Sequence, residues 1–286
     1  MPMQLPPKYS NIFEYLEENY GLDAPDTPLT RLYKSEIAEI QYPNLDGPVT
    51  KEKILFEDRE SAAEMVRSFA KGAGADIVGF TSVKGNFVFE DQTILQKNCV
   101  VLAVEMDYDL IETAPESPSG TEVLRAYWYL ADIAIKVARF IRSMGYPAQA
   151  HHPRSYADFP PTILQTVAAI EAGMGELGRH GVLITPEFGP RVRVATVTTD
   201  LELPKGGRKE FGVDKFCSGC HVCYDACEGD AIPMEKTVVR GHRKYTIDPY
   251  KCLPEFAKYD GCNICVARCV FNKRPEALRP FIRTLD

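Results

Sequence analysis

The sequence predicts a mixed α and β fold, α/β or α+β, followed by a smaller cysteine-rich domain. Predicted helices and strands alternate over residues 51–205, which is the pattern of mixed folds. Eight of the nine cysteines lie between Cys217 and Cys269, beyond a polar, glycine-containing boundary. The first 50 residues are rich in proline and tyrosine and only weakly periodic. We therefore predict an N-terminal arm at 1–50, a main domain at 51–205 and a cysteine-rich domain at 206–286.

The first predicted helix of the main domain ends at Gly72 and presents one apolar face. That face is expected to contain Ala63, Met65, Val66 and Phe69. A strand is predicted over residues 76–80, and a second, buried strand in the continuous apolar run that begins at Asn98.

The longest predicted helix runs from Thr121 to Met144, because apolar residues recur there at steps of three and four and Gly145 follows. A shorter helix is predicted over residues 162–172. It precedes a glycine-rich stretch that ends in an alternating strand over residues 192–198.

Composition and charge narrow the class of protein. The chain has 45% hydrophobic and 26% charged residues, as ordinary globular proteins do. Its net charge of -7 argues against a nucleic-acid partner, since such proteins carry a basic face. No apolar run reaches the roughly 18 residues that a membrane helix needs. The N-terminus shows neither a signal peptide nor a twin-arginine pair, so we expect a cytoplasmic protein without a membrane segment.

The cysteines form two runs with related spacing. The first is Cys217-x2-Cys220-x2-Cys223-x3-Cys227, and the second is Cys252-x9-Cys262-x2-Cys265-x3-Cys269. Two-cluster bacterial ferredoxins use the first spacing, in which three cysteines bind one cluster and the fourth binds the other. Applied to both runs, this reciprocity uses all eight cysteines. It assigns one 4Fe–4S cluster to Cys217, Cys220, Cys223 and Cys269, and the other to Cys227, Cys252, Cys262 and Cys265.

Two alternatives to iron–sulfur clusters follow from the same residues. Disulfides are disfavoured because the chain is neither short nor evidently exported. Two zinc sites built from C-x-x-C pairs would leave no use for a further cysteine three residues later.

The stretch from Glu171 to Leu203, together with the cysteine runs, resembles the cobalamin-dependent reductive dehalogenases. It contains G-E-x-G-R-x-G from Gly175 and P-E-F-G-P-x-V-R up to Arg193. The resemblance extends over roughly residues 55–275. It implies a nitroreductase-like cobalamin-binding domain followed by a ferredoxin-like domain with two 4Fe–4S clusters. It also implies base-off cobalamin, a small organohalide or related substrate, and a low-potential electron donor such as ferredoxin or flavodoxin.

Two other functions stay open from the sequence. Epoxyqueuosine reductase shares this plan, but its motif G-x-x-G-K-H-T differs from the segment Gly175 to Gly181. A non-catalytic electron carrier with two clusters is the second alternative. It would not bind cobalamin.

The resemblance also suggests two catalytic residues. Tyr127 matches a tyrosine that donates a proton, and Arg193 matches an active-site arginine. A phenol with a pKa of ~10 needs a cationic neighbour for this task. The alternatives are a core position for Tyr127, with Tyr108 or Tyr129 as the proton donor, and a structural ion pair of Arg193 with Glu187 or Asp200.

The glycine-rich stretch is expected to line the corrin. Its glycines either permit turns or let a large ligand approach the backbone, and His180 is expected to be structural. The predicted cobalamin-binding residues are Gly173, Gly175, Gly178, Arg179, Gly181, Pro186 and Gly189.

Overall fold

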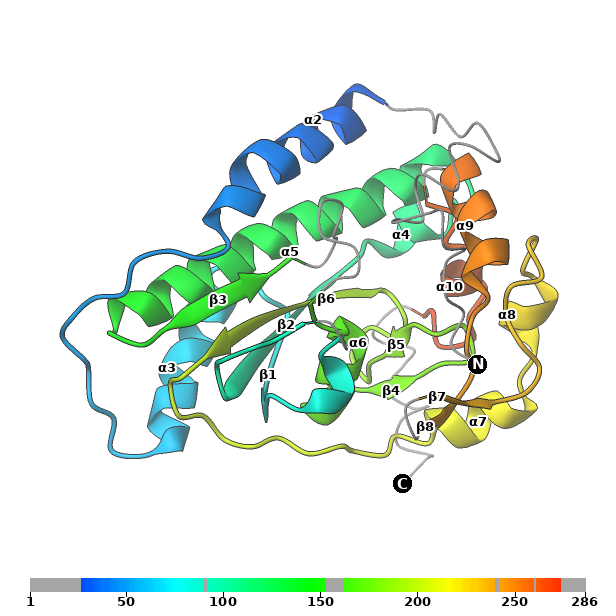
Figure 1. Cartoon of the computed structure of the whole chain (residues 1–286). Helices are drawn as coiled ribbons and strands as arrows, with labels where there is room; N and C mark the ends of the chain where they lie inside the picture. The colour runs from blue at the N-terminus through cyan, green and yellow to red at the C-terminus, as the bar shows by residue number, and fades with distance from the viewer. Residues whose placement is uncertain (1–26, 90–91, 153–161, 240–241, 260, 274–286) are drawn as a thin grey trace.

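The computed structural model describes residues 27–89, 92–152, 162–239, 242–259 and 261–273 (Figure 1). Its centre is a four-stranded antiparallel sheet in the order β1-β2-β6-β3. The strands are β1 Ile77–Ser82, β2 Asn98–Glu105, β6 Val192–Thr199 and β3 Ala148–His151. The predicted strands are therefore present, although β6 is buried along nearly its whole length and does not alternate.

The burial of β6 has a simple cause, because both faces of the sheet are covered. Val100, Leu102 and Val197 pack into one core with residues of two helices, α3 (Arg59–Gly72) and α5 (Ser117–Ser143). Val101 and Val194, on the opposite face, pack into a second core with residues of helix α6. Strands that are covered on both faces lose the alternation of polar and apolar residues.

Helix α3, Arg59–Gly72, begins at Asp58, whose side chain accepts a hydrogen bond from the Ser61 amide. Its buried face contains Ala62, Ala63, Val66 and Ala70. Met65 was wrongly predicted to belong to this face, because 44% of it is exposed. A residue one position before Val66 is rotated by about 100° around the helix, which takes its side chain off the buried stripe.

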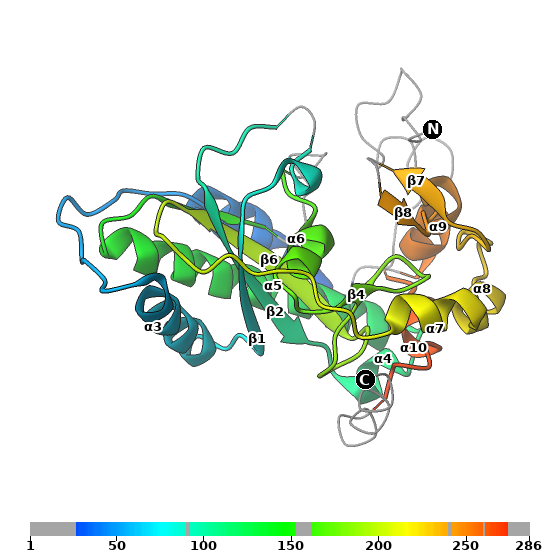
Figure 2. The same cartoon turned by 90° about the horizontal axis from the view of Figure 1, so that it is seen from below.

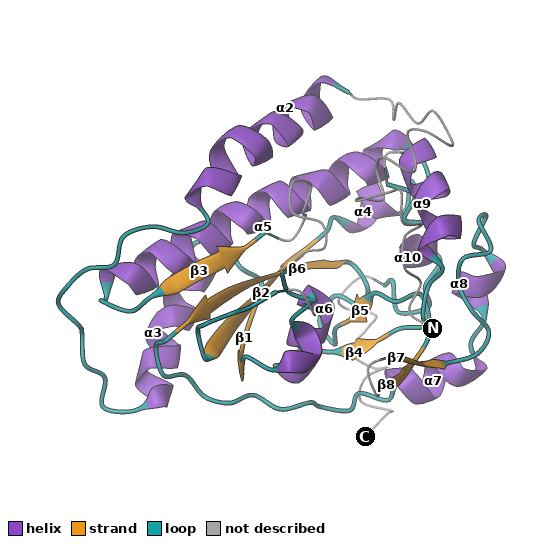
Figure 3. Ribbon diagram, viewed as in Figure 1, coloured by secondary structure: helices purple, strands orange, loops and turns teal. Residues whose placement is uncertain are grey.

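Helix α5, Ser117–Ser143, is the longest helix and lies along the sheet (Figures 1 and 3). It begins four residues before the predicted start, with Pro118 in its first turn, where the missing amide of a proline costs no helical hydrogen bond. The helix α6, Gln165–Glu171, is shorter than predicted. Helix α4, Tyr108–Ile111, and the hairpin of β4, Glu176–Leu177, with β5, Leu183–Ile184, complete the main domain.

The described part of the predicted N-terminal arm is helical. Helix α2, Pro28–Glu36, continues into short π and 3-10 turns over 37–44. The segment packs on α5, where Trp128 Nε1 donates to Glu36 Oε2 and Gln41 donates to the Trp128 carbonyl. Residues 1–26 of the predicted arm lie outside the described part of the chain.

The cysteine-rich domain lies at one end of the sheet, beside the beginning of α5 (Figure 2). Asn263 of this domain donates to Ser119 Oγ in the first turn of α5, at 3.1 Å. The elements of this domain are α7 Val213–Gly219, α8 Val222–Asp225, β7 Thr237–Val239, β8 His242–Lys244, α9 Pro249–Lys258 and α10 Ile264–Ala267. Among the described residues, none of the helices is long and apolar enough to cross a membrane.

Candidate functional site

The larger of two cavities among the described residues, called the main cavity below, has a volume of about 310 Å³ and is lined by both the main domain and the cysteine-rich domain. The main domain contributes Tyr127 from α5, Arg193 from β6 and the first residues of α6 to its wall. The cysteine-rich domain contributes four thiols, from Cys227, Cys252, Cys262 and Cys265. The cavity therefore places four of the predicted cluster-binding thiols and the two predicted catalytic residues around one space.

A second, smaller cavity is lined by the other four cysteines of the two runs, Cys217, Cys220, Cys223 and Cys269. The two cavities thus divide the eight cysteines into the same groups that reciprocal spacing predicts. The crossing occurs within five residues, because Cys265 in α10 lines the main cavity and Cys269, just after the end of this helix, lines the second one.

The thiols of both groups are partly or fully buried and close to one another. Burial raises the pKa of Cys269 to about 12 and that of Cys252 to about 11, and neighbouring thiols of the same group add to the effect. Only coordination to a metal centre would hold such thiols as thiolates. Over the part of the chain that the structure describes, no three His, Cys, Asp or Glu side chains converge closely enough to hold a single metal ion.

Tyr127 and Arg193 lie together in the wall of the main cavity. The Arg193 guanidinium lies 5.2 Å from the centre of the Tyr127 ring. Tyr127 is half-buried and also packs against the core. Its position is therefore compatible with both interpretations of the sequence, a proton donor and a core residue. Within the described residues Arg193 makes no ion pair, either with Glu187 or with Asp200. Its guanidinium is therefore held close to the phenol without being neutralised by a carboxylate.

The two alternative tyrosines lie elsewhere. The Tyr108 ring lies 5.3 Å from the Arg191 guanidinium, and the Tyr129 ring is 5.9 Å from that of Arg125. Neither tyrosine is among the described residues that line the two cavities. Tyr127 is thus the tyrosine of the three that reaches the main cavity.

The sequence analysis missed Asn263, which connects the two domains. Its Oδ1 accepts a hydrogen bond from Arg193 Nη2 at 3.4 Å, while its Nδ2 donates to Ser119 and to the Gly261 carbonyl. Its backbone is left-handed, with φ of 53°, a conformation that Asn tolerates better than most residues. An asparagine directly after the first cysteine of a C-x-x-C pair was the signal that could have identified it.

Arg179, which is predicted to bind cobalamin, is buried against the cysteine-rich domain. Its side chain is 1% exposed and donates hydrogen bonds to five main-chain carbonyls in the cysteine-rich domain. Those carbonyls belong to Cys217, Ser218, Cys220, Pro233 and Met234. The guanidinium also stacks 4.3 Å from the centre of the Tyr245 ring. Arg179 therefore shapes the loop that carries the second cavity's cysteines.

Replacing Arg179 with Lys is expected to weaken iron retention by that loop. An ammonium cannot reach five carbonyls, and each hydrogen bond to a charged group is worth about 1.5–3 kcal/mol. Loss of one such bond should make a chelator remove the cluster of this cavity at least about tenfold faster, which visible absorbance and iron release would measure. The exposed Arg59, paired with Glu202 on the surface, provides a matched Arg→Lys control. Equal release rates in the two variants would contradict this role.

Most of the predicted cobalamin-binding glycines contact protein atoms. A Cβ on Gly175 would lie 2.3 Å from the Ile184 carbonyl oxygen, and one on Gly189, where φ is +58°, would lie 2.0 Å from that of Phe271. Gly173 and Gly178 are similarly crowded by the chain, and Pro186 is not among the described residues that line either cavity. Gly181 is the one member of the predicted set in the wall of the main cavity. These glycines chiefly allow close packing of the chain against itself.

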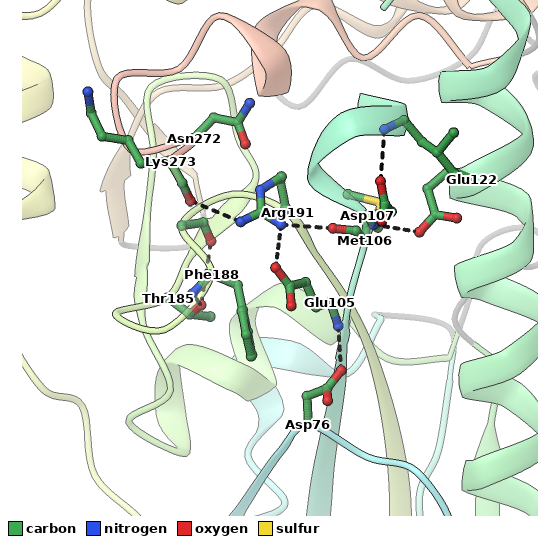
Figure 4. Close-up of polar contacts among 12 residues, drawn as sticks. Asp76, Glu105, Met106, Asp107, Glu122, Thr185, Phe188, Arg191, Asn272 and Lys273 are labelled. Atoms are coloured by element: carbon green, nitrogen blue, oxygen red, sulfur yellow. Dashed lines mark hydrogen bonds and ion pairs between the residues drawn. The ribbon is translucent and has the colours of Figure 1, made fainter. Parts of the chain in front are cut away.

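Arg191 is a further residue that the sequence analysis did not place (Figure 4). It is fully buried, and its Nη1 donates to Glu105 and, at 2.8 Å, to the Met106 carbonyl. Its Nη2 donates to the Lys273 carbonyl at 3.0 Å. Arg191 thus ties the end of β2 to the segment after the last cysteine, whereas Arg193 points into the cavity.

Three buried polar atoms in the wall of the main cavity have no hydrogen-bond partner among the described residues. They are Gln165 Oε1, His180 Nε2 and Arg193 Nε. Burial lowers the pKa of His180 to about 4, so this imidazole is neutral at physiological pH. Three residues of the cavity wall thus have a polar atom that lacks a hydrogen-bond partner among the described residues.

Comparison with known proteins gives this site a context. Residues 216–273 match the model of the 4Fe-4S dicluster domain. The chain is 38% identical over 191 residues to a tetrachloroethene reductive dehalogenase of Desulfitobacterium hafniense, a match that covers 62% of this chain and 33% of that protein. It is also 31% identical over 129 residues to the epoxyqueuosine reductase of Cellulophaga algicola, over 42% of this chain and 40% of that one.

The fold leads to the same relatives. A solved reductive dehalogenase, for which a mechanism of B12-dependent dehalogenation has been suggested, superimposes with a TM-score of 0.78 at 25% identity, over 89% of this chain and 38% of that chain. This confirms the predicted fold of a reductive dehalogenase-like domain followed by a 4Fe–4S dicluster domain. The chain spans about a third of the length of the tetrachloroethene reductive dehalogenase that it matches. The chain is similar in sequence and in fold to reductive dehalogenases, and it also shows similarity to epoxyqueuosine reductase.

Proposed function

We propose that the protein is a reductive dehalogenase-like oxidoreductase that uses cobalamin and two 4Fe–4S clusters to remove halide from an organohalide. The observation that carries this proposal is the main cavity. It brings four cluster-binding cysteines to the same space as Tyr127 and Arg193. An electron carrier would need the cysteines but would have no use for a phenol and a guanidinium beside them.

The cavity wall fits a corrin in its hydrogen-bonding character. The rim of a corrin carries amide side chains, which both donate and accept hydrogen bonds. Gln165 Oε1 could accept such a bond, and Arg193 Nε could donate one. These buried atoms would otherwise each carry a desolvation cost of about 1–3 kcal/mol. When bound, the cobalamin would supply a low-potential cobalt centre for reductive cleavage of the carbon–halogen bond.

Two residues of the protein would supply the proton and stabilise the phenolate that remains. The overall reaction, R–X + 2e⁻ + H⁺ → R–H + X⁻, needs one proton at the carbon that loses the halide. Tyr127 would donate this proton from its phenolic oxygen. Arg193, whose charge lies over the face of the Tyr127 ring, would stabilise the phenolate that remains. When bound, the two clusters would supply one-electron transfer to the main cavity from a low-potential donor such as ferredoxin or flavodoxin. The cysteines of one cluster line the main cavity, and those of the other line the second cavity. The first set is Cys227, Cys252, Cys262 and Cys265, and the second is Cys217, Cys220, Cys223 and Cys269.

Halide release by the reconstituted protein tests this function. The chain, purified without oxygen and loaded with iron, sulfide and cobalamin, would be assayed with reduced viologen as donor on tetrachloroethene and on a halogenated phenol. We expect halide release that requires both cobalamin and the clusters. Retention of both cofactors without halide from either compound would contradict the proposal. Failure to bind cobalamin at all would instead favour the electron carrier.

Epoxyqueuosine reduction is the second candidate, because one relative of that function matches at 31% identity. The same loaded protein would be assayed on epoxyqueuosine-containing RNA. Conversion there, with no halide release from the organohalides, would assign the chain to that reaction.

A further inference from the structure

His180 lies in the wall between the two cavities. Of the described residues that line either cavity, it is the one that lines both. Its neighbours in the sequence divide between the two spaces. Arg179 lines the second cavity, and Gly181 and Val182 line the main one. The imidazole therefore stands between the two groups of four cysteines.

The position of the proton on this imidazole follows from its one hydrogen bond. His180 Nδ1 accepts from the Val182 amide at 3.1 Å, so Nδ1 carries a lone pair and the proton of the neutral ring is on Nε2. Gly178 confines the ring from one side, since a Cβ there would lie 2.6 Å from His180 Cε1. The ring is thus fixed with its N–H on the edge away from Val182.

That N–H is buried and has no partner among the described residues. Buried donors in native proteins are nearly always satisfied. Once the clusters proposed above are in place, the sulfurs of a cluster bound by the cysteines of either cavity could accept from this N–H. A neutral N–H donor between two clusters is suited to a sulfur, because hydrogen bonds to sulfur are among the features that set cluster potentials.

We propose that His180 donates its Nε2–H to a sulfur of one of the two 4Fe–4S clusters and thereby raises the reduction potential of that cluster. The donor withdraws negative charge from the cluster, so it favours the reduced form in the step [4Fe–4S]²⁺ + e⁻ → [4Fe–4S]⁺. One N–H makes one good hydrogen bond. His180 would therefore raise the reduction potential of one cluster and leave that of the other unchanged. His180 is a positioning and tuning residue in this proposal, which rests on the two clusters of the proposed function and does not depend on dehalogenation.

Redox titrations followed by electron paramagnetic resonance test this role in the protein loaded with iron and sulfide. In His180→Phe, which keeps a ring but has no donor, we expect both clusters to be retained. At a fixed potential, the ratio of reduced to oxidised form should fall about tenfold for one cluster, a shift of about 59 mV for one electron, and stay unchanged for the other. His180→Gln, which keeps a donor near the position of Nε2, should restore part of the difference. Unchanged potentials in His180→Phe would overturn the proposal.

Two further measurements test the proposal if His180→Phe loses iron and its reduction potentials cannot be compared with those of the wild type. Gly178→Ala should displace the ring without removing it and lower the potential of the same cluster. In wild-type protein labelled with ¹⁵N-histidine, pulsed spectra of the reduced clusters should show coupling to an imidazole nitrogen, and its absence would overturn the proposal. His151→Phe is the matched control, because His151 is a buried histidine that bonds Thr198 and is not among the described residues lining either cavity. A wild-type protein without cluster signals would refute the cluster assignment itself, which is a different result.

Discussion

Replacing Tyr127 with Phe is expected to lower turnover by about 10²–10⁴ while leaving iron and cobalamin content unchanged. The loss corresponds to about 3–5 kcal/mol of transition-state stabilisation, the range of a missing general acid. The substitution removes only the phenolic oxygen, and the ring keeps its contacts with the core and with the Arg193 guanidinium. Steady-state halide release with reduced viologen would measure the effect.

Tyr129→Phe provides the matched control for this experiment. Tyr129 lies on the same helix, is also half-buried and lies under an arginine, but is not among the described residues that line the cavity. Its replacement should leave turnover within about twofold of wild type, since it makes no contact with the reacting groups. Full activity in Tyr127→Phe would assign Tyr127 to the core alone. Arg193→Lys should also reduce turnover, because an ammonium cannot reproduce the planar guanidinium over the ring.

Replacing Cys265 and Cys269 separately with Ser is expected to remove different clusters. The two residues are in the same short stretch, but Cys265 lines the main cavity and Cys269 the second one. Each variant should keep about four of about eight irons, and each should lose turnover because the electron path is interrupted. Iron analysis and the spectra of the remaining reduced cluster would show which one survives.

Two further variants, at other cysteines assigned to the same two clusters, test the grouping of the cysteines. Cys217→Ser should give the same surviving spectrum as Cys269→Ser, and Cys252→Ser the same as Cys265→Ser. Identical spectra for Cys265→Ser and Cys269→Ser would contradict the reciprocal assignment. Two zinc ions per chain and no visible absorbance in the wild type would contradict the clusters.

The sequence by itself determined the features that depend on neighbours within one segment. Periodicity predicted α3 and α5, and a continuous apolar run predicted β2, because each element buries residues that its own sequence defines. The grouping of the cysteines followed from spacing for a similar reason, since gaps of two and three residues limit which thiols share a loop. The predicted start of α5 fell after Pro118, which the helix accommodates in its first turn, and Met65 was misplaced because it lies off the buried stripe of α3.

Only the tertiary structure decided which polar side chains meet. Arg179, Arg191 and Arg193 come from one stretch of sequence, yet the first binds loop carbonyls, the second joins β2 to the segment after the last cysteine, and the third lies over Tyr127. Asn263 reaches Ser119 across a separation of 144 residues. Long side chains on neighbouring positions can point to different partners, and the packing of distant segments sets which partner is near. The environment of Tyr127 and the place of His180 between the two cavities are consequences of the interface between the domains, and no local pattern in the sequence encodes them.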